Sequence, residues 1–472
     1  MKIPAIAESR SYFIVSFCLL ILSVVSTFSG HDAQRIVQVV IGVMAVFYLL
    51  KHSFSGAAAA YFDTGTRVVF SLVFVLGLFS CLAARQPVWA MVELALAVTS
   101  CAIGLFFFQS RIRGGDSMDR LLVVFVCLLC SIKSVQFLAS VLSAFSSGEA
   151  IADTDLLLEG FSNKRFYGQF QTLTLPLLVF PLLIFPIRKA IKIGAFTLLA
   201  SWWFLVVSGG TRGSWLGMMV AASVLFFLGA SGRRWVRWQL MTALVGVLSF
   251  WLLFGVVADY LGLRILNFAG DRLNSSLSLR EIIWQQAWDM IRERPWLGFG
   301  PMHFADIANP IAAHPHQAVL QWASEWGGPS ALCVAWLVLR GLFATIRLIR
   351  EKADSQEPAD LLRLCLFASL VGALTQSMVD GVIVMPYSQL WLALVVGWLL
   401  GLHRWSSEPA AVGSALRWSG RFVSVAAVAL LVWVVLRDVP HLQERNEQYA
   451  RDFGGHFQPR FWAQGVIAQK HP

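Results

Sequence analysis

Long apolar runs recur along the whole of this 472-residue chain and decide its class. A helix needs about 17–25 mostly apolar residues to cross the ~30 Å hydrocarbon core of a bilayer. Hydrophobic residues make up 57% of the chain and charged residues only 14%, whereas soluble domains carry about 25% charge. The sequence predicts an all-α polytopic membrane protein with about 12–13 transmembrane helices, near residues 12–29, 36–50, 68–84, 88–109, 121–144, 169–187, 193–208, 214–231, 238–257, 318–339, 362–384, 386–402 and 422–436.

Positive charge is unevenly distributed among the loops between these runs. The short loops of one alternate set carry little more than Arg35 and Arg85, whereas the other set is rich in lysine and arginine: Lys51 and Arg67; Arg111, Arg113 and Arg120; Arg188, Lys189 and Lys192; Arg233, Arg234 and Arg237; Arg340, Arg347, Arg350 and Lys352; Arg404, Arg417 and Arg421. Because cytoplasmic loops collect positive charge, we expect a multi-pass membrane protein with a cytoplasmic N-terminus, whose other loops face the far side of the membrane, the periplasm in a Gram-negative cell. The same asymmetry accounts for much of the net charge of +10 without a nucleic-acid partner.

The chain shows no internal repeat and no low-complexity linker, so we expect one transmembrane domain, 1–436, and a charged C-terminal tail, 437–472. Thirteen spans place this tail in the periplasm, as we expect. If the short run 422–436 does not cross, twelve spans place it in the cytoplasm. The tail contains a Pro-Arg-Phe-Trp cluster at 459–462, and we expect it to form a small packed or interfacial appendage.

The longest hydrophilic interruption before the tail is the loop at about 258–317, which in this orientation is periplasmic. Polar and ionisable side chains are dense in it: Arg272, Arg280, Asp289, Arg292, Arg294, His303, His314 and His316. Ser278 and Glu281 have the spacing of a capping box, and Pro295 ends the helix that this pattern predicts. Apolar residues at helical spacing indicate an amphipathic helix along the membrane surface. We expect this loop to carry the chemistry.

Two arginines lie at predicted helix starts, where free backbone N–H groups and the helix dipole favour an anion. Arg212 follows Gly209 and Gly210 in the loop near 209–213, where Thr211 or Ser214 can cap the next helix. Arg280 is in the first turn of the amphipathic helix, where a cation gains nothing from the dipole. A guanidinium fork suits phosphate oxygens. Ordinary interfacial or surface arginines are the alternative for both positions.

Two histidines, His314 and His316, flank a proline just before the run 318–339. An imidazole titrates near neutral pH and can take a proton from a hydroxyl. We expect the proline to keep the two rings apart, with His316 held against the next helix and His314 further out on the loop. No cysteine or clustered carboxylate completes a tetrahedral zinc set nearby, so we expect neither a metal site nor a cofactor.

The loop before the run 169–187 alternates aromatic and polar residues. We expect it to stack on sugar rings and bond their hydroxyls, although interfacial aromatic belts have the same composition. Its candidate substrate-binding residues are Lys164, Arg165, Tyr167 and Gln169.

Four segments together resemble the O-antigen ligase and polymerase superfamily. In order they read Gly-Thr-Arg-Gly-Ser-Trp-Leu-Gly, Ser-Leu-Arg-Glu-Ile-Ile-Trp, Pro-Trp-Leu-Gly-Phe-Gly-Pro and His-Pro-His-Gln, and the resemblance covers roughly residues 160–400. It implies about twelve helices with a large periplasmic loop over a membrane-facing cavity. It also implies transfer of a whole glycan from an undecaprenyl-pyrophosphate carrier to an acceptor hydroxyl, without a metal.

The resemblance also assigns residues. Arg212 and Arg280 match the two diphosphate-binding arginines of the family, and His316 matches its catalytic histidine. Gln317 stands where the family often has asparagine, and we count it with His314 as substrate-binding. The implied reaction is an inverting single displacement.

The acceptor stays open among lipid A core, a pilin-like protein and another repeat unit, because ligases, protein O-oligosaccharyltransferases and polymerases share these motifs. We favour ligase-type transfer to core or protein over polymerisation. A flippase or transporter is the alternative of another class. Transporters carry charges inside many helices or repeated halves, whereas the charges inside the runs here are few and unrepeated, namely Glu93, Lys133, Glu325 and Asp380.

Overall fold

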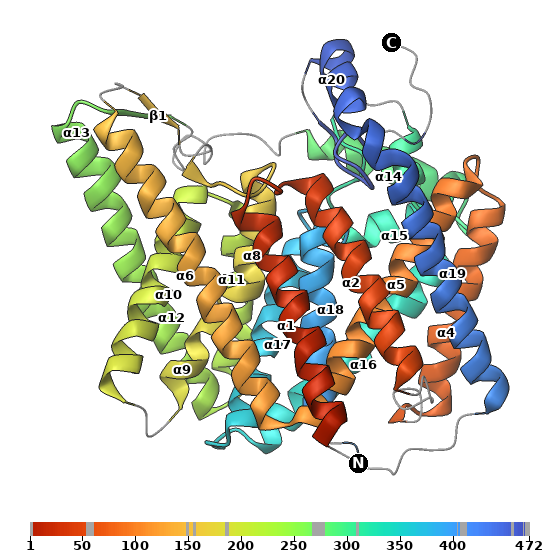
Figure 1. Cartoon of the computed structure of the whole chain (residues 1–472), viewed down its shortest axis with the longest axis horizontal. Coiled ribbons are helices and arrows are strands. Elements are labelled where there is room, and N and C mark those ends of the chain that lie inside the picture. The colour runs from red at the N-terminus through yellow and green to blue at the C-terminus, as the bar shows by residue number, and fades with distance from the viewer. Residues whose placement is uncertain are drawn as a thin grey trace. The chain divides into compact units, whose positions relative to one another are not determined.

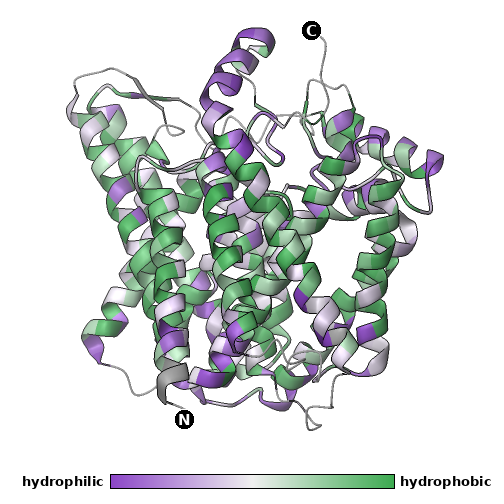
Figure 2. Ribbon diagram, turned by 45° about the vertical axis from the view of Figure 1, so that its right-hand side comes forward, coloured by the Kyte–Doolittle hydropathy of each residue, from purple (hydrophilic) through white to green (hydrophobic). Residues whose placement is uncertain are grey.

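The computed structural model describes residues 3–52, 61–147, 151–153, 157–184, 188–266, 279–307, 311–403, 405, 413–454, 457–465 and 467. Nearly all of these residues lie in helices and the short connections between them (Figure 1). Figure 2 shows hydrophobic residues along the length of the helices and hydrophilic residues gathered at their ends and in α20. The predicted all-α polytopic class is confirmed.

Ten helices in the described residues are long and apolar enough to cross a membrane. An eleventh predicted span, 169–187, is a bent pair in which Lys164–Thr174 and Leu177–Leu183 meet at 41°. Pro176 lies at the break and has no N–H to continue the helix. Two further predicted spans coincide with the shorter apolar helices Arg212–Phe226 and Pro386–Leu402. Twelve of the thirteen predicted spans therefore have an apolar helical counterpart. The predicted span 318–339 is wrong in its bounds, because Gly327 separates Ala318–Trp326 from the long apolar helix Gly328–Glu351. Which side each loop faces stays a prediction.

The chain divides into two compact units, which we describe separately. The first unit comprises Met1–Gly30, Ser110–Ser276 and Thr345–Gln376. Its elements, in addition to the end of α16, are α1 (Ile3–Val25), α6 (Asp116–Ser146), α8 (Lys164–Thr174), η1 (Leu177–Val179), α9 (Phe180–Leu183), α10 (Lys189–Gly209), α11 (Arg212–Phe226), α12 (Ala230–Phe250), the π-helix η2 (Trp251–Val257), α13 (Ala258–Tyr260) and α17 (Pro358–Ser377). Two short strands, β1 (Ile151–Asp153) and β2 (Arg264–Leu266), pair with each other in parallel.

The second unit comprises His31–Gln109, Leu277–Ala344 and Ser377–Pro472. Its elements are α2 (His31–Lys51), α4 (Thr64–Leu82), α5 (Pro87–Gly114), α14 (Arg280–Glu293), η4 (His303–Asp306), α15 (Ala318–Trp326), α16 (Gly328–Glu351), α18 (Pro386–Leu402), α19 (Ser414–Asp438), η5 (Val439–His441) and α20 (Leu442–Phe453). The chain passes from one unit to the other after Gly30, Gln109, Ser276, Ala344 and Gln376, and two of these points lie within α5 and α16.

Small residues bring helices close together in both units. In the first unit, a Cβ added at Gly246 of α12 would lie 2.8 Å from the backbone nitrogen of Phe204 in α10. In the second, a Cβ at Gly397 of α18 would lie 2.2 Å from the carbonyl oxygen of Gly104 in α5. Contacts this close require glycine, as is common where membrane helices pack without a hydrophobic driving force between them.

Candidate active site

Helix α14 supports the loop that carries the two histidines. Trp284 Nε1 donates a hydrogen bond to the carbonyl oxygen of Pro315, at 3.0 Å. One face of α14 is buried in a small apolar cluster formed by Ile283, Ala287, Met290 and Phe304. Arg280, the first residue of α14, is half-buried and precedes Trp284 by about one helical turn. The amphipathic helix predicted here is therefore present. The hydrogen bond from Trp284 fixes the start of this helix relative to Pro315.

The start of α14 differs from the predicted capping box. The N-cap residue is Leu279, which makes no side-chain capping bond, and Ser278 lies outside the described residues. Leu279 has a φ of 61°, in the left-handed region that a branched side chain rarely adopts.

Three described non-glycine residues have positive φ, and all three lie between positions 279 and 316: Leu279, Met302 and His316, with φ of 61°, 72° and 55°. Such conformations cost of order 1–3 kcal/mol each and cluster at functional sites. Their concentration in this segment supports the prediction that it carries the chemistry.

His316 faces the carboxylate of Asp380, which is not among the predicted site residues. Its Nδ1 lies 3.9 Å from Oδ1 of Asp380, and the two side chains are 14% and 7% exposed. The distance is longer than a hydrogen bond, as is common in catalytic pairs without substrate. The same carboxylate accepts a hydrogen bond from the backbone N–H of Gly381, at 2.8 Å. Asp380 can therefore orient the ring of His316.

Our expectation for His314 is wrong. Its side chain is buried, and its ring lies edge-on to that of His316, with centroids 4.1 Å apart. Its Nδ1 accepts a hydrogen bond from the backbone N–H of His316, at 3.3 Å. The positive φ of His316 turns the chain back and brings the rings together despite Pro315. His314 is thus a buried support of His316, and His316 is the more exposed of the two.

Two further polar residues, Gln317 and His303, make hydrogen bonds that stabilise the local fold. The side chain of Gln317 accepts a hydrogen bond from the N–H of Leu320 and caps α15, while its use in substrate binding stays a prediction. His303 Nε2 accepts from the N–H of Gln86 at 2.8 Å, so its Nδ1–H donates to the carbonyl of Pro301 at 3.0 Å. Burial lowers the pKa of His303. This histidine is a neutral brace of the loop.

Arg212 lies in the first unit, on a turn between α10 and α11. Gly210 ends α10 with a φ of 57°, and Arg212 begins α11 with an exposed side chain. Thr211 occupies the N-cap position, but its hydroxyl bonds to the Ser214 hydroxyl at 2.9 Å and makes no capping bond. Ser214 in turn donates to the carbonyl of Gly168, at 2.9 Å. The turn is thus attached to α8, with Arg212 at its surface.

The segment expected to be a sugar-binding loop is a helix, α8. Lys164, Tyr167 and Gln169 are buried within the first unit, and Arg165 is half-buried. The Tyr167 ring contacts the half-buried ring of Phe161 edge-on, with centroids 5.0 Å apart, and it lies near the buried rings of Phe170 and Trp202. The expected loop is therefore wrong as local structure. Contact of these four residues with a sugar stays a prediction.

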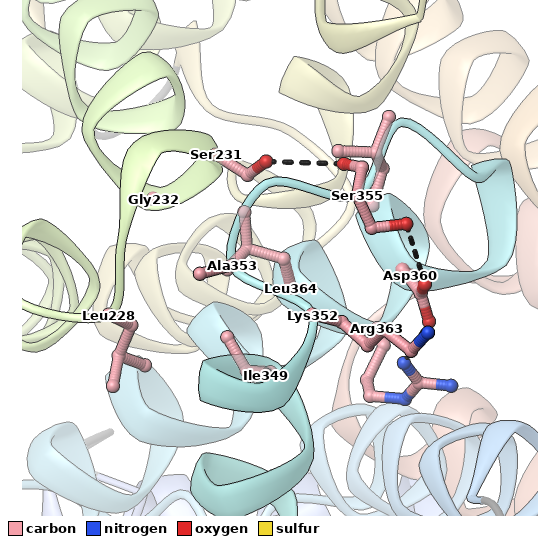
Figure 3. Close-up of a pocket in the computed structure, with 11 residues that line it drawn as sticks. Leu228, Ser231, Gly232, Ile349, Lys352, Ala353, Ser355, Asp360, Arg363 and Leu364 are labelled. Atoms are coloured by element: carbon pink, nitrogen blue, oxygen red, sulfur yellow. Dashed lines mark hydrogen bonds and ion pairs between the residues drawn. The ribbon is translucent and has the colours of Figure 1, made fainter.

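Neither of two cavities in the described residues is lined by a predicted site residue. The first lies where the turn after α11 meets the segment between α16 and α17 (Figure 3). There Ser231 donates to the carbonyl of Ser355 at 3.3 Å, and Ser355 donates to Asp360 at 2.7 Å. At about 10 Å³ it holds no more than a water. The second, about 280 Å³, lies in the second unit beside Glu93 and Glu325.

Residues 195–335 match the model of a protein family described as O-antigen ligase. The chain carries an O-antigen ligase domain. This domain includes Arg212, Arg280 and the His-Pro-His loop, and it ends before Asp380. The match is shorter than the resemblance read from the motifs, but it confirms the superfamily. The O-antigen ligase family is one of membrane enzymes that transfer glycosyl groups. No curated protein matches the chain.

Proposed function

We propose that this chain transfers a glycan as one block from an undecaprenyl-pyrophosphate carrier to an acceptor hydroxyl, with inversion at the anomeric carbon. The O-antigen ligase domain supports the reaction class. The observation that carries the proposal is the His316–Asp380 pair: the imidazole lies on the strained loop inside that domain, 3.9 Å from a carboxylate on the turn between α17 and α18.

His316 is the proposed general base. With Nδ1 directed at Asp380, Nε2 takes the proton of the acceptor hydroxyl. The hydroxyl oxygen forms a bond to the anomeric carbon while the bond from that carbon to the phosphate oxygen breaks, and the lipid pyrophosphate leaves with the bonding electron pair. A carboxylate behind the imidazole favours the imidazolium that forms, as in other histidine–carboxylate pairs. A general base of this kind contributes ~10²–10⁴ in rate.

Arg280 and Arg212 are the proposed diphosphate clamps. Arg280 is joined to the base through α14, because Trp284 one turn later is bonded to Pro315. Arg212 begins α11 in the first unit, where the helix N-terminus already favours an anion. Two fixed guanidinium forks would stabilise the charge that develops on the leaving pyrophosphate.

The proposed acceptors are lipid A core or a pilin-like protein, with polymerisation of repeat units as the alternative. The reaction requires the donor's pyrophosphate at a membrane surface, and the positive charge of the opposite set of loops favours the periplasmic face of the inner membrane for it. Membrane lipids surround the chain, and the chemistry assigned to His316, Arg212 and Arg280 uses neither a metal nor a cofactor.

The direct test is reconstitution of the purified protein in nanodiscs with a lipid-linked glycan and either lipid A core or a pilin acceptor. We expect a covalent glycan–acceptor product that forms equally in the presence of EDTA. The matched inactive control is His316→Asn, because asparagine tolerates the left-handed backbone that position 316 requires. Translocation of the lipid-linked glycan without product would instead identify a flippase, and product on another repeat unit would identify a polymerase. An active His316→Asn variant would remove the proposed base.

A further inference from the structure

A cluster of four charged residues in the second unit, three of them buried and one, Glu93, 13% exposed, has no part in the chemistry above. It consists of Arg35 in α2, Glu93 in α5, Glu325 in α15 and Arg460 in the C-terminal segment. Arg460 Nη2 lies 2.6 Å from Oε2 of Glu325 and 3.7 Å from Oε1 of Glu93. Arg35 and Arg460 are each 1% exposed.

Stability is a weak explanation for this cluster. Taking charges out of water costs about as much as their attraction returns, and well-packed apolar residues are often as stable or more so. A buried ionic group among membrane-spanning helices is expensive and is usually tied to function. The backbone groups that the two arginines bind indicate what that function is.

Arg460 binds both ends of the segment that carries the histidines. Its Nη1 donates to the carbonyl of Ala313, the residue before His314, at 3.4 Å. Its partner Glu325 is near the end of α15, the helix that Gln317 caps. The other oxygen of Glu325 accepts from the N–H of Phe304 at 3.0 Å, which ties in the apolar cluster under α14. Arg460 thus holds the His316 side of the pair.

Arg35 binds the turn that follows Asp380. Its Nη2 donates to the carbonyl of Val384 and to the carbonyl of Arg460, both at 3.0 Å. Its Nη1 donates to Gln389 Oε1 at 2.7 Å, and Gln389 Nε2 donates to the carbonyl of Ile383 at 2.8 Å. Arg35 therefore holds the Asp380 side and joins it to the tail through the Arg460 backbone.

We propose that the C-terminal segment 457–465 positions the catalytic pair, with Arg460 holding the loop of His316 and Arg35 holding the turn of Asp380. Both are positioning residues, because their bonds go to the backbone around the pair and to buried side chains. The role rests on the proposed function, in which His316 is the base. This positioning role makes the segment 457–465 a part of the proposed active site.

The first test replaces Arg460 by lysine in the full-length chain. Lysine keeps a charge for Glu325 but is a point donor that cannot reach Glu325 and the Ala313 carbonyl with a rigid fork. Because misplacement by about 1 Å can cost 10²-fold, we expect kcat to fall about 10²-fold while KM for the lipid-linked donor stays unchanged. The matched control is Arg340→Lys, which alters an exposed arginine of the same unit that pairs with Asp63 and not with the C-terminal segment, and it should retain kcat.

The second test separates positioning from stability. The double variant Arg460→Met with Glu325→Met removes one positive and one negative charge, so that Arg35 and Glu93 remain as the opposite charges of the cluster. We expect thermal unfolding at the same or a higher temperature than in the unaltered protein, with the same ~10²-fold loss of kcat, since a well-packed apolar pair can replace an ion pair without loss of stability.

Unchanged kcat in a folded double variant would overturn the positioning role, and so would a loss of activity that only tracks the loss of folded protein. Neither result touches the proposed function, which is decided by His316→Asn. If that variant is active, the base assignment fails whatever the arginine variants do.

Discussion

The turn that carries Arg212 and the loop that carries His316 are both short connections before a helix, but they are held in opposite ways. Neutral, mostly local contacts hold the Arg212 turn: Gly210 ends one helix, and two hydroxyls attach the next one to the carbonyl of Gly168. The His316 loop is held by charged side chains from distant parts of the sequence, above all Arg460. The first kind of site can be recognised in a short motif, whereas the second needs the whole fold.

The largest effect should come from the two histidines. We expect His316→Asn to lower glycan transfer by ~10²–10⁴ because it removes the base. His314→Asn should keep most of the activity, since the asparagine oxygen can accept the His316 N–H that His314 Nδ1 accepts now. His314→Leu has no such acceptor and should lose more. Transferred glycan on the acceptor, measured in membranes with equal amounts of folded protein, orders the three variants. If His314→Asn is the inactive one, the roles of the two histidines are reversed.

The two arginines should give the next largest effect and should behave alike although they lie in different units. Arg212→Lys and Arg280→Lys keep the charge and lose the planar fork, so we expect each to lower kcat by ~10²–10³. Arg233→Lys, at an exposed position outside the proposed site, is the control and should be unaffected. Normal turnover in both lysine variants would mean that neither arginine holds a diphosphate.

A smaller effect on turnover should come from replacing the glycines that pack against the Arg212 turn and against the His316 loop. A Cβ at Gly168 would be 2.4 Å from Oγ1 of Thr211, and one at Gly381 would be 2.4 Å from Cε1 of His314. Overpacking of this kind costs about 1–3 kcal/mol, so alanine at either position should lower both the unfolding temperature and the turnover. The matched controls are Gly194→Ala and Gly341→Ala, where an added Cβ would meet no packed atom within 4 Å. Full activity in Gly168→Ala would show that the attachment of α8 to the Arg212 turn is dispensable.

The sequence predicted the helices well because length and hydropathy alone determine which segments can cross a bilayer. The helix from Arg280 was also predictable, since its apolar spacing and Pro295 are local signals. The segment from Lys164 was not. Its alternating aromatic and polar residues are typical of a surface, and burial became visible only with the bent span that places Tyr167 against Phe161.

The histidine site was predicted in part. The motif His-Pro-His identified the right loop, but the burial of His314 depends on Gly381, more than sixty residues later in the chain. In the sequence, Asp380 is a charge within an apolar run, and no spacing links it to His316. Arg460 was visible in the Pro-Arg-Phe-Trp cluster, but its partners lie in α15 and in the loop at Ala313. Contacts between residues this far apart in sequence leave no periodic signal.

The smallest effect on activity should come from cysteines that report topology, and they sharpen the comparison because the proposed reaction needs both regions on one side of the membrane. Three exposed positions are suitable: Ser147→Cys directly after α6, Glu293→Cys at the end of α14 and Glu444→Cys in α20. We expect an impermeant thiol reagent to label all three in intact spheroplasts and to spare Arg233→Cys. Arg233 is a better labelling position than the adjacent Gly232, because a Cβ added at Gly232 would lie 2.0 Å from the carbonyl oxygen of Leu225. Each variant should retain turnover, so labelling can be interpreted in active protein.

Protection at Glu444 alone would mean that α19 does not cross, and then the tail that contains Arg460 could not reach a periplasmic His316. That result would therefore contradict the positioning role of the tail as well as the thirteen-span topology, whereas labelling at Arg233 would reverse the orientation of the whole chain.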